Sequence, residues 1–232
     1  MEQKLISVII PTYMEEKYID RTLISIKEQS YDNFEIIIAD SESPDNTVEI
    51  ANKYADKIIS IEKKGISHGR NSGAGIAEGD ILLFVDADTI LEKDFLKVLS
   101  GMFSDKSVVC AHGNVTSKEV SYRLIYNLCS KLMHFSSIIG FPMFTGMCVA
   151  YLKEIFQKVN GFREDLVTAE DYDLSLRVKK FGKCVFVKEA RAVTDPRRLR
   201  LWGMPKTIGF HSLNVCRYIL TDTAFSDYPP LR

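Results

Sequence analysis

The sequence predicts an α/β domain with a mostly parallel central sheet flanked by helices. Two observations support this prediction. About the first 90 residues alternate between strand-like and helix-like patterns, and residues 81–85 form a wholly apolar run typical of a buried strand. The 232 residues contain no internal repeat, low-complexity tract or linker, and 46% of them are hydrophobic. We therefore expect one domain over residues 1–232 with a sizeable core.

Each element expected in the first part of the chain has a local signal. Pro11 is expected to end the first strand. Ser43, Pro44 and Asp45 are expected to open the second helix, because proline suits an early helical position and acids suit the first turn. The expected strands are residues 5–10, 34–39, 57–61 and 81–85, and the expected helices are residues 17–29, a helix starting at residue 43, and residues 68–77.

After residue 88 the alternation loosens, and a smaller second part is expected over about residues 91–232. Its expected helices are residues 91–103, 120–135 and 172–181, and its expected strands are residues 108–111, 143–151 and 184–187. Residues 132–152 carry no charge, but His134, Pro142 and several glycines and hydroxyl residues make them too polar and too broken for a membrane span. This stretch is interpreted as a helix end, a loop and a buried strand.

Composition excludes some classes of protein. The net charge is −1 and Lys and Arg are spread along the chain, which argues against a nucleic-acid-binding protein with its usual basic face. The five cysteines lack the two-residue spacing of a zinc site, so reduced thiols in a cytoplasmic protein are expected. Residues 5–11 are too short an apolar stretch for a signal peptide.

The apolar run at residues 81–85 ends in Asp86-Ala87-Asp88. If the strand geometry continues, Asp86 and Asp88 point to the same side, and two carboxylates at one place need a cation. Hard oxygen ligands suit Mg²⁺ or Mn²⁺, which usually also bind substrate phosphates. The alternative is that these acids cap a helix starting near Glu92.

Polar residues also follow the other expected strands, at the edge of the sheet where ligands bind in parallel α/β folds. Tyr13 offers an aromatic face for a base, Asp40 offers an acceptor for a base N–H, and Arg70 lies near a helix start that favours phosphate. Each has an ordinary explanation, as a packing residue, a helix-cap partner and a surface cation respectively. Their common position at one edge favours a site.

The order and spacing of these motifs resemble those of family-2 glycosyltransferases with the GT-A fold. The resemblance covers about residues 5–203. It rests on Val8-Ile9-Ile10-Pro11-Thr12-Tyr13, the run from Asp40 to Thr47, Gly69-Arg70-Asn71-x-Gly73, Asp86-Ala87-Asp88, Gly161-Phe162, Glu170-Asp171 and Val193-Thr194-Asp195-Pro196-Arg197-Arg198.

The resemblance implies a single GT-A domain with a Rossmann-like sheet, in which residues 1–90 bind the nucleotide and residues 91–232 bind the acceptor. It implies an inverting transfer of sugar from a UDP- or GDP-sugar to an acceptor hydroxyl, with Mn²⁺ or Mg²⁺ as cofactor. By position, Asp171 would be the general base, and Asp88 with Asp86 would bind the metal. The implied donor-binding residues are Pro11, Thr12, Tyr13, Glu15, Asp40, Arg70, Asp86, Ala87 and Asp88. The implied acceptor-side or diphosphate residues are Gly146, Glu170, Arg197, Arg198 and Trp202.

Two positions depart from the family pattern. Met14 replaces a frequent Asn, and Thr194-Asp195 lies where many members have a His as third metal ligand. We expect one of three alternatives to take the role of that His: Asp195 as an oxygen ligand, Arg197 and Arg198 neutralising the diphosphate, or His211.

Two alternative functions are a sugar-phosphate nucleotidyltransferase and a catalytically silent nucleotide-sugar binding protein. The first would need a glycine-rich phosphate loop after the first strand, and Pro11-Thr12-Tyr13-Met14-Glu15 is not one. The acceptor is expected to be a glycan or a lipid-linked molecule. Uncharged residues 132–152 and the basic residues 197–202 add the hypothesis of peripheral contact with the inner face of the membrane, without a transmembrane span.

Overall fold

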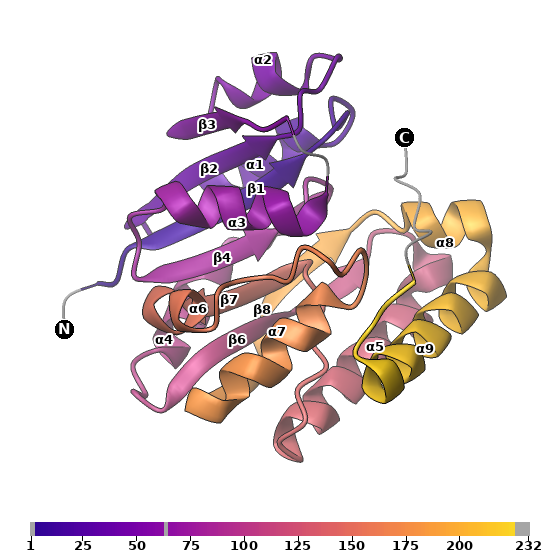
Figure 1. Cartoon of the computed structure of the whole chain (residues 1–232). Helices are drawn as coiled ribbons and strands as arrows, with labels where there is room; N and C mark the ends of the chain where they lie inside the picture. The colour runs from indigo at the N-terminus through magenta and orange to yellow at the C-terminus, as the bar shows by residue number, and fades with distance from the viewer. Residues whose placement is uncertain (1–2, 63–64, 226–232) are drawn as a thin grey trace.

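The computed structural model describes residues 3–62 and 65–225, which form one eight-stranded sheet with helices on both faces (Figure 1). The strand order is β3-β2-β1-β4-β7-β6-β8-β5. Four of the seven neighbouring pairs are parallel and three are antiparallel. The predicted α/β class with a mostly parallel sheet is therefore confirmed. The strands are β1 Ile6–Thr12, β2 Phe34–Asp40, β3 Lys57–Ser60, β4 Ile81–Val85, β5 Thr89–Leu91, β6 Val108–Ser117, β7 Cys148–Leu152 and β8 Lys183–Thr194.

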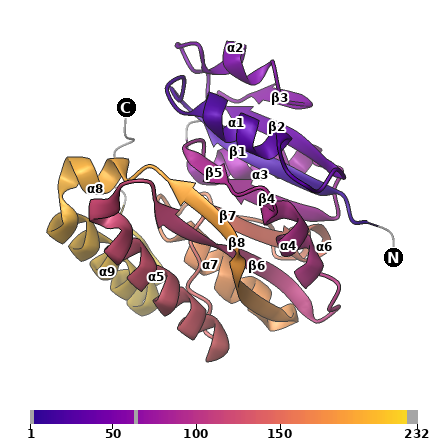
Figure 2. The ribbon, with the colours of Figure 1, turned by 180° about the vertical axis from the view of Figure 1, so that it is seen from behind.

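The sheet separates two apolar cores because successive residues of a strand face opposite sides. Strand β1 shows this alternation clearly: Val8 and Ile10 join the core beneath α1 and α4, whereas Ile9 joins the core beneath α3 and α7. Helices α3, α6 and α7 lie in front of the sheet in Figure 1, and α1 and α4 in Figure 2. The helices are α1 Ile19–Lys27, α2 Thr47–Ala51, α3 Ile66–Ile76, α4 Phe95–Met102, α5 Val120–Ile138, α6 Lys153–Lys158, α7 Glu170–Val178, α8 Arg197–Trp202 and α9 Met204–Thr221.

Pro11 does not end the first strand, which was predicted wrongly. It pairs in register with Ala39, and β1 continues to Thr12. Ser41 N donates to Thr12 O, so Thr12 faces β2 and Pro11, by alternation, faces β4. Pairing between β1 and β4 stops at Ile9, so the missing N–H of the proline leaves no ladder bond unmade.

The second helix begins at Thr47, four residues later than expected from Ser43. Asp45 Oδ1 accepts hydrogen bonds from the backbone N–H (3.1 Å) and the hydroxyl (2.5 Å) of Thr47. This local turn competes with helix formation across the Ser-Pro-Asp segment.

The region after β4 differs most from the expectation. Strand geometry does not continue through Asp86-Ala87-Asp88, because Thr89 N donates to Asp86 O at 3.1 Å and closes a turn. The helix-cap alternative is also wrong, since β5 intervenes and the next helix, α4, begins at Phe95. The predicted helix end, loop and strand in residues 132–152 are confirmed by α5 and β7. Helices α8 and α9 were not predicted.

No helix in the described part of the chain is both long enough and apolar enough to cross a membrane.

Candidate active site

The carboxyl ends of β1 and β2 are joined by a buried hydrogen-bond network around Asp40. Thr12 Oγ1 donates to Asp40 Oδ1 at 2.7 Å, and Ser43 donates to the same carboxylate from its backbone N–H (2.7 Å) and its hydroxyl (2.6 Å). Met14 N donates to Ser43 Oγ at 2.9 Å. Asp40 therefore fixes the loop that carries Tyr13, which is half-buried.

Arg70 is a buried junction between α3, the turn after β4 and α7. Its Nη1 donates to Glu170 Oε1 at 2.9 Å, and its Nη2 donates to Asp86 Oδ1 at 3.1 Å. Only 2% of Arg70 is exposed, so the surface-cation alternative is wrong. The guanidinium lies 5.2 Å from the ring centroid of Phe162, within the range of a cation–π contact.

Gly146 brings the Arg70 junction against Asp171. A Cβ at position 146 would lie 2.1 Å from Arg70 Nη2, so only glycine allows this approach. Gly146 N donates to Asp171 Oδ2 at 2.8 Å, and Tyr172 N donates to Asp171 Oδ1 at 2.9 Å. Each oxygen of the Asp171 carboxylate, at the start of α7, therefore accepts a hydrogen bond from one backbone N–H. Asp86, Arg70, Gly146 and Asp171 thus form one continuous cluster.

Arg197, at the start of α8, joins two further predicted residues. Its Nη1 and Nη2 donate to the two oxygens of Glu15 at 2.9 and 3.1 Å, and its Nε donates to Asp88 Oδ2 at 2.9 Å. Thr194 Oγ1 donates to Asp88 Oδ1 at 3.3 Å. The Arg197 guanidinium also lies 4.5 Å from the ring centroid of Tyr18. Arg197 therefore bridges Glu15, which was predicted to bind the donor, and Asp88, which was predicted to bind the metal.

Four carboxyl groups of this region have raised pKa values. Burial raises the pKa of Glu15 to about 7 despite the opposing charge of Arg197. Burial raises the pKa of Glu170 to about 8, with the charge of Asp171 adding to the shift. Burial also raises the pKa values of Asp88 and Asp171. Clustered perturbed carboxyl groups are typical of functional sites.

The fit of a divalent cation depends on the available donors. Asp86 and Asp88 supply carboxylate oxygens, the ligand type that Mg²⁺ and Mn²⁺ prefer, but each already has an arginine partner. In residues 3–62 and 65–225, no group of three or more His, Cys, Asp or Glu is arranged to hold an ion. The donors fit an ion that takes its other ligands from a diphosphate and water.

Asp195 and His211, two of the expected third-ligand candidates, have other neighbours. Asp195 pairs with Lys118 Nζ at 2.5 Å and Arg200 Nη2 at 2.7 Å. It lines, with Asp88, a small pocket of about 110 Å³. Burial and the charge of Arg198 lower the pKa of His211.

The remaining predicted residues fall into two places. Arg198 stacks on Trp202, with its Cζ 4.7 Å from the ring centroid, so these two form a cluster on α8. Ala87 is buried in the turn after β4, where its carbonyl accepts a hydrogen bond from Thr22 Oγ1 at 2.8 Å. The structure pairs Arg197 with Asp88, and it groups Arg198 with Trp202.

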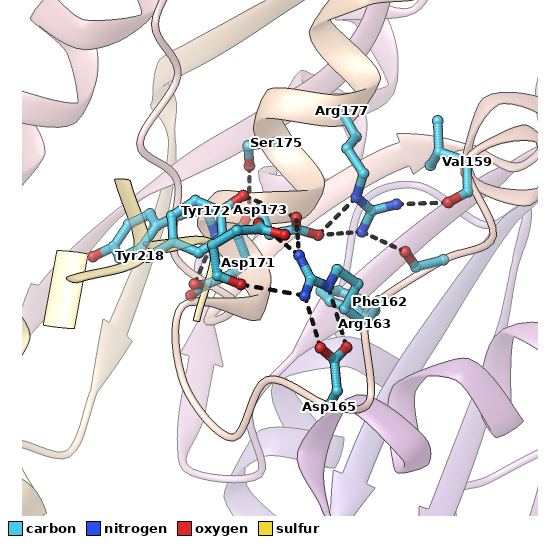
Figure 3. Close-up of polar contacts among 12 residues, drawn as sticks. Val159, Phe162, Arg163, Asp165, Asp171, Tyr172, Asp173, Ser175, Arg177 and Tyr218 are labelled. Carbon is cyan, nitrogen blue, oxygen red and sulfur yellow. Dashed lines mark hydrogen bonds and ion pairs between the residues drawn. The ribbon is translucent and has the colours of Figure 1, made fainter. Parts of the chain in front are cut away.

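Sequence reasoning missed Asp173, which anchors the helix that carries Asp171. Arg177 Nε donates to Asp173 Oδ2 at 2.7 Å, and Tyr218 OH donates to Asp173 Oδ1 at 2.9 Å (Figure 3). Arg177 also donates to two backbone carbonyls of the preceding loop, at 2.6 and 2.7 Å. These contacts tie α7 to α9 and to the loop after α6. The acidic pattern Glu-Asp-x-Asp was the only sequence signal for this role.

Comparison with known proteins identifies the family and the fold of this chain. The family model described as "Glycosyl transferase family 2" matches residues 7–159 of the 232, more than half of the chain. An uncharacterized glycosyltransferase of Haemophilus influenzae is 33% identical over 120 residues, which cover 49% of this chain and 48% of that protein. Chondroitin synthase of Pasteurella multocida is 29% identical over 192 residues, which cover 77% of this chain and 19% of that protein. The chain spans about half or less of the length of these relatives.

Solved structures share the fold. The mannosyltransferase PcManGT from Pyrobaculum calidifontis, in complex with GDP-Man and Mn²⁺, matches with a TM-score of 0.70 at 23% identity, covering 94% of this chain and 61% of that chain. S. aureus TarS 1–349, in complex with UDP-GlcNAc, matches with a TM-score of 0.67 at 22% identity, covering 83% of this chain and 58% of that chain. The fold is that of the GT-A glycosyltransferases. The chain belongs to glycosyl transferase family 2.

Proposed function

We propose that this chain transfers a sugar from a nucleoside-diphosphate sugar, with UDP or GDP as the nucleotide, to an acceptor hydroxyl. The single observation that carries the proposal is the continuous cluster from Asp86 through Arg70 and Gly146 to Asp171. It joins a cationic diphosphate-binding group to a carboxylate base at the carboxyl edge of the sheet. The complexes of PcManGT with GDP-Man and of TarS with UDP-GlcNAc support the donor class.

On the donor side, Thr12, Tyr13 and Asp40 are proposed to hold the base, and Glu15 to lie near the ribose. Arg70, Arg197 and Arg198 supply positive charge where negative charge grows on the departing diphosphate. A cation that is already fixed in place stabilises the transition state without any further rearrangement of the protein. Arg70 meets this condition because Glu170 and Asp86 hold it.

A divalent cation, Mn²⁺ or Mg²⁺, is proposed to bind at Asp88 and Asp86. When bound, such an ion supplies Lewis-acid stabilisation of phosphoryl oxygens. The carboxylate donors support this proposal, as does the Mn²⁺ in the PcManGT complex. Arg197 contacts Asp88, so its guanidinium must give way when an ion reaches that carboxylate.

Asp171 is proposed as the general base that takes the proton from the acceptor hydroxyl. Burial and the charge of Asp171 raise the pKa of the neighbouring Glu170, so the two acids titrate together as a pair. The raised pKa of Asp171 makes it a stronger base than a free carboxylate. One base without a second nucleophilic carboxylate predicts inversion at the anomeric carbon.

The acceptor is proposed to be a glycan or a lipid-linked molecule, bound by the second half of the chain on the side of Gly146 and Trp202. We place the reaction on the cytoplasmic side of the membrane. All five cysteines are unpaired, which supports a reducing compartment.

The test is Asp171→Asn, with donor turnover and nucleotide affinity measured separately. Binding of UDP or GDP should persist while transfer falls by about 10²-fold or more. Asp165→Asn is the control, because Asp165 is an exposed acid of the loop before α7 and lies outside the cluster of Asp171. Transfer by Asp171→Asn at the parent rate would show that the base is wrongly assigned. The anomeric configuration of the product, read by proton NMR, tests inversion.

The same assays separate the two alternative functions. A nucleotidyltransferase releases pyrophosphate from a nucleoside triphosphate and a sugar phosphate. A silent binding protein binds nucleotide without turnover on a broad panel of acceptors.

A further inference from the structure

The face of helix α5 that is exposed to solvent is apolar. A surface helix usually exposes its polar face and buries its apolar face. The buried residues of α5 are Ser130, Met133 and Ser136. Large apolar residues occupy the opposite, exposed face at helical spacing, and Leu124 is 82% exposed. This exposed stripe consists of Val120, Leu124, Leu128, Leu132, Phe135 and Ile138.

Helix α9 has the same inverted pattern. It buries Thr207 and Asn214, and it exposes Ile208, Leu213 and Leu220, the last by 82%. Helices α5 and α9 lie at the same end of the molecule in both views (Figures 1 and 2). Exposed apolar residues that gather at one end of a molecule mark an interaction site.

The charges on and near the two helices indicate a negatively charged partner. The chain as a whole is nearly neutral, at −1, but residues 120–153 and 196–221 contain no Asp or Glu. The cations Lys131 on α5 and Lys206 and Arg217 on α9 are exposed. The ring of Trp202 contacts two basic groups: Arg198 Cζ lies 4.7 Å and Lys206 Nζ 5.1 Å from its centroid. Apolar residues flanked by Trp, Lys and Arg are typical of helices that lie in a membrane interface.

We propose that α5 and α9 form a docking surface for an anionic lipid bilayer. A second copy of this chain is a poorer partner. A symmetric contact would bring the cations of both copies together, and neither helix carries an acid to pair with them. Lipid phosphates supply the missing negative charge, and acyl chains cover the apolar stripe. This proposal does not rest on the proposed sugar transfer, because the binding of lipid is measured without nucleotide.

The test is flotation of the whole chain with vesicles of phosphatidylcholine alone or mixed with phosphatidylglycerol. The parent should float with the mixed vesicles and stay behind with the neutral ones. A triple substitution of the stripe should abolish flotation without lowering the melting temperature, because these side chains are exposed. The stripe variant is Leu124→Gln/Leu128→Gln/Leu132→Gln, and its matched control on other exposed positions is Ile24→Gln/Ile66→Gln/Ile76→Gln.

The electrostatic part is tested by Lys131→Ala/Lys206→Ala against the control Lys53→Ala/Lys93→Ala. Each basic residue near an anionic surface contributes about a fivefold factor in affinity, so the first pair should weaken binding by roughly 25-fold and the control should not. Two results would overturn the proposal. One is a parent chain that stays wholly unbound with anionic vesicles. The other is a dimer in solution, seen by light scattering, that the stripe variant converts to monomer.

Discussion

Removal of Arg197 tests the idea that a guanidinium holds the place of a metal ion in the free protein. Arg197→Ala leaves Glu15 and Asp88 without the cation that contacts both at 2.9 to 3.1 Å. Breaking a buried ion pair by removing one partner costs about 3–5 kcal/mol. The Arg197 side chain is 17% exposed, and Glu15, whose pKa is already raised to about 7, can take up a proton. We therefore expect a smaller loss of about 2 kcal/mol at neutral pH.

For a chain of this size, that loss corresponds to a fall in melting temperature of about 4–8 °C. Mn²⁺ added at a fixed, saturating concentration of UDP or GDP should restore most of it, because an ion at about 100 times its dissociation constant adds roughly 2.7 kcal/mol. The parent should gain less from Mn²⁺, since Arg197 competes for Asp88. The assay is thermal unfolding across a Mn²⁺ titration.

The control is Arg200→Ala, an arginine of the same helix whose partners are Glu119 and Asp195. It should not increase the response to Mn²⁺. Equal stabilisation of the parent and Arg197→Ala by Mn²⁺ would refute the reasoning, because the arginine would then not occupy the site of the ion.

Three further predictions concern stability. Gly73→Ala should lower the free energy of unfolding by about 1–3 kcal/mol, because its Cβ would lie 2.5 Å from Ile9 Cγ2. Gly75→Ala in the same helix has open space around it and should raise the free energy of unfolding by about 0.5–1 kcal/mol. Urea unfolding measures both, and equal changes would contradict the packing argument. Gly146→Ala should lower both stability, by about 1–3 kcal/mol, and sugar transfer, because the methyl group displaces the buried guanidinium beneath it; unchanged unfolding would count against that contact. Burial lowers the pKa of His112 from 6.5 to about 4, so the unfolded chain binds the extra proton between these values and stability should fall by up to about 3 kcal/mol as the pH drops from 6.5 to 4. His112→Gln should flatten this dependence in urea unfolding at several pH values, and an unaltered slope would exclude His112 as its source.

Some parts of the fold follow from local pattern. The run Ile81–Val85 is apolar throughout because both of its faces are covered, and its type and bounds were predicted correctly. Helices α8 and α9 were missed for the opposite reason. Their apolar residues are largely exposed, so the hydrophobic period does not indicate an inward face.

The sequence by itself determined the class of the fold and the family, because strand periodicity and motif spacing are local properties of the chain. It also determined that acids follow β4. Only the tertiary structure decided which cation meets which acid. Arg70 meets Glu170 across 100 residues, and Arg197 meets Asp88 across 109 and Glu15 across 182. Pairings at such separations depend on how the sheet brings strand ends together, and no local pattern encodes that arrangement.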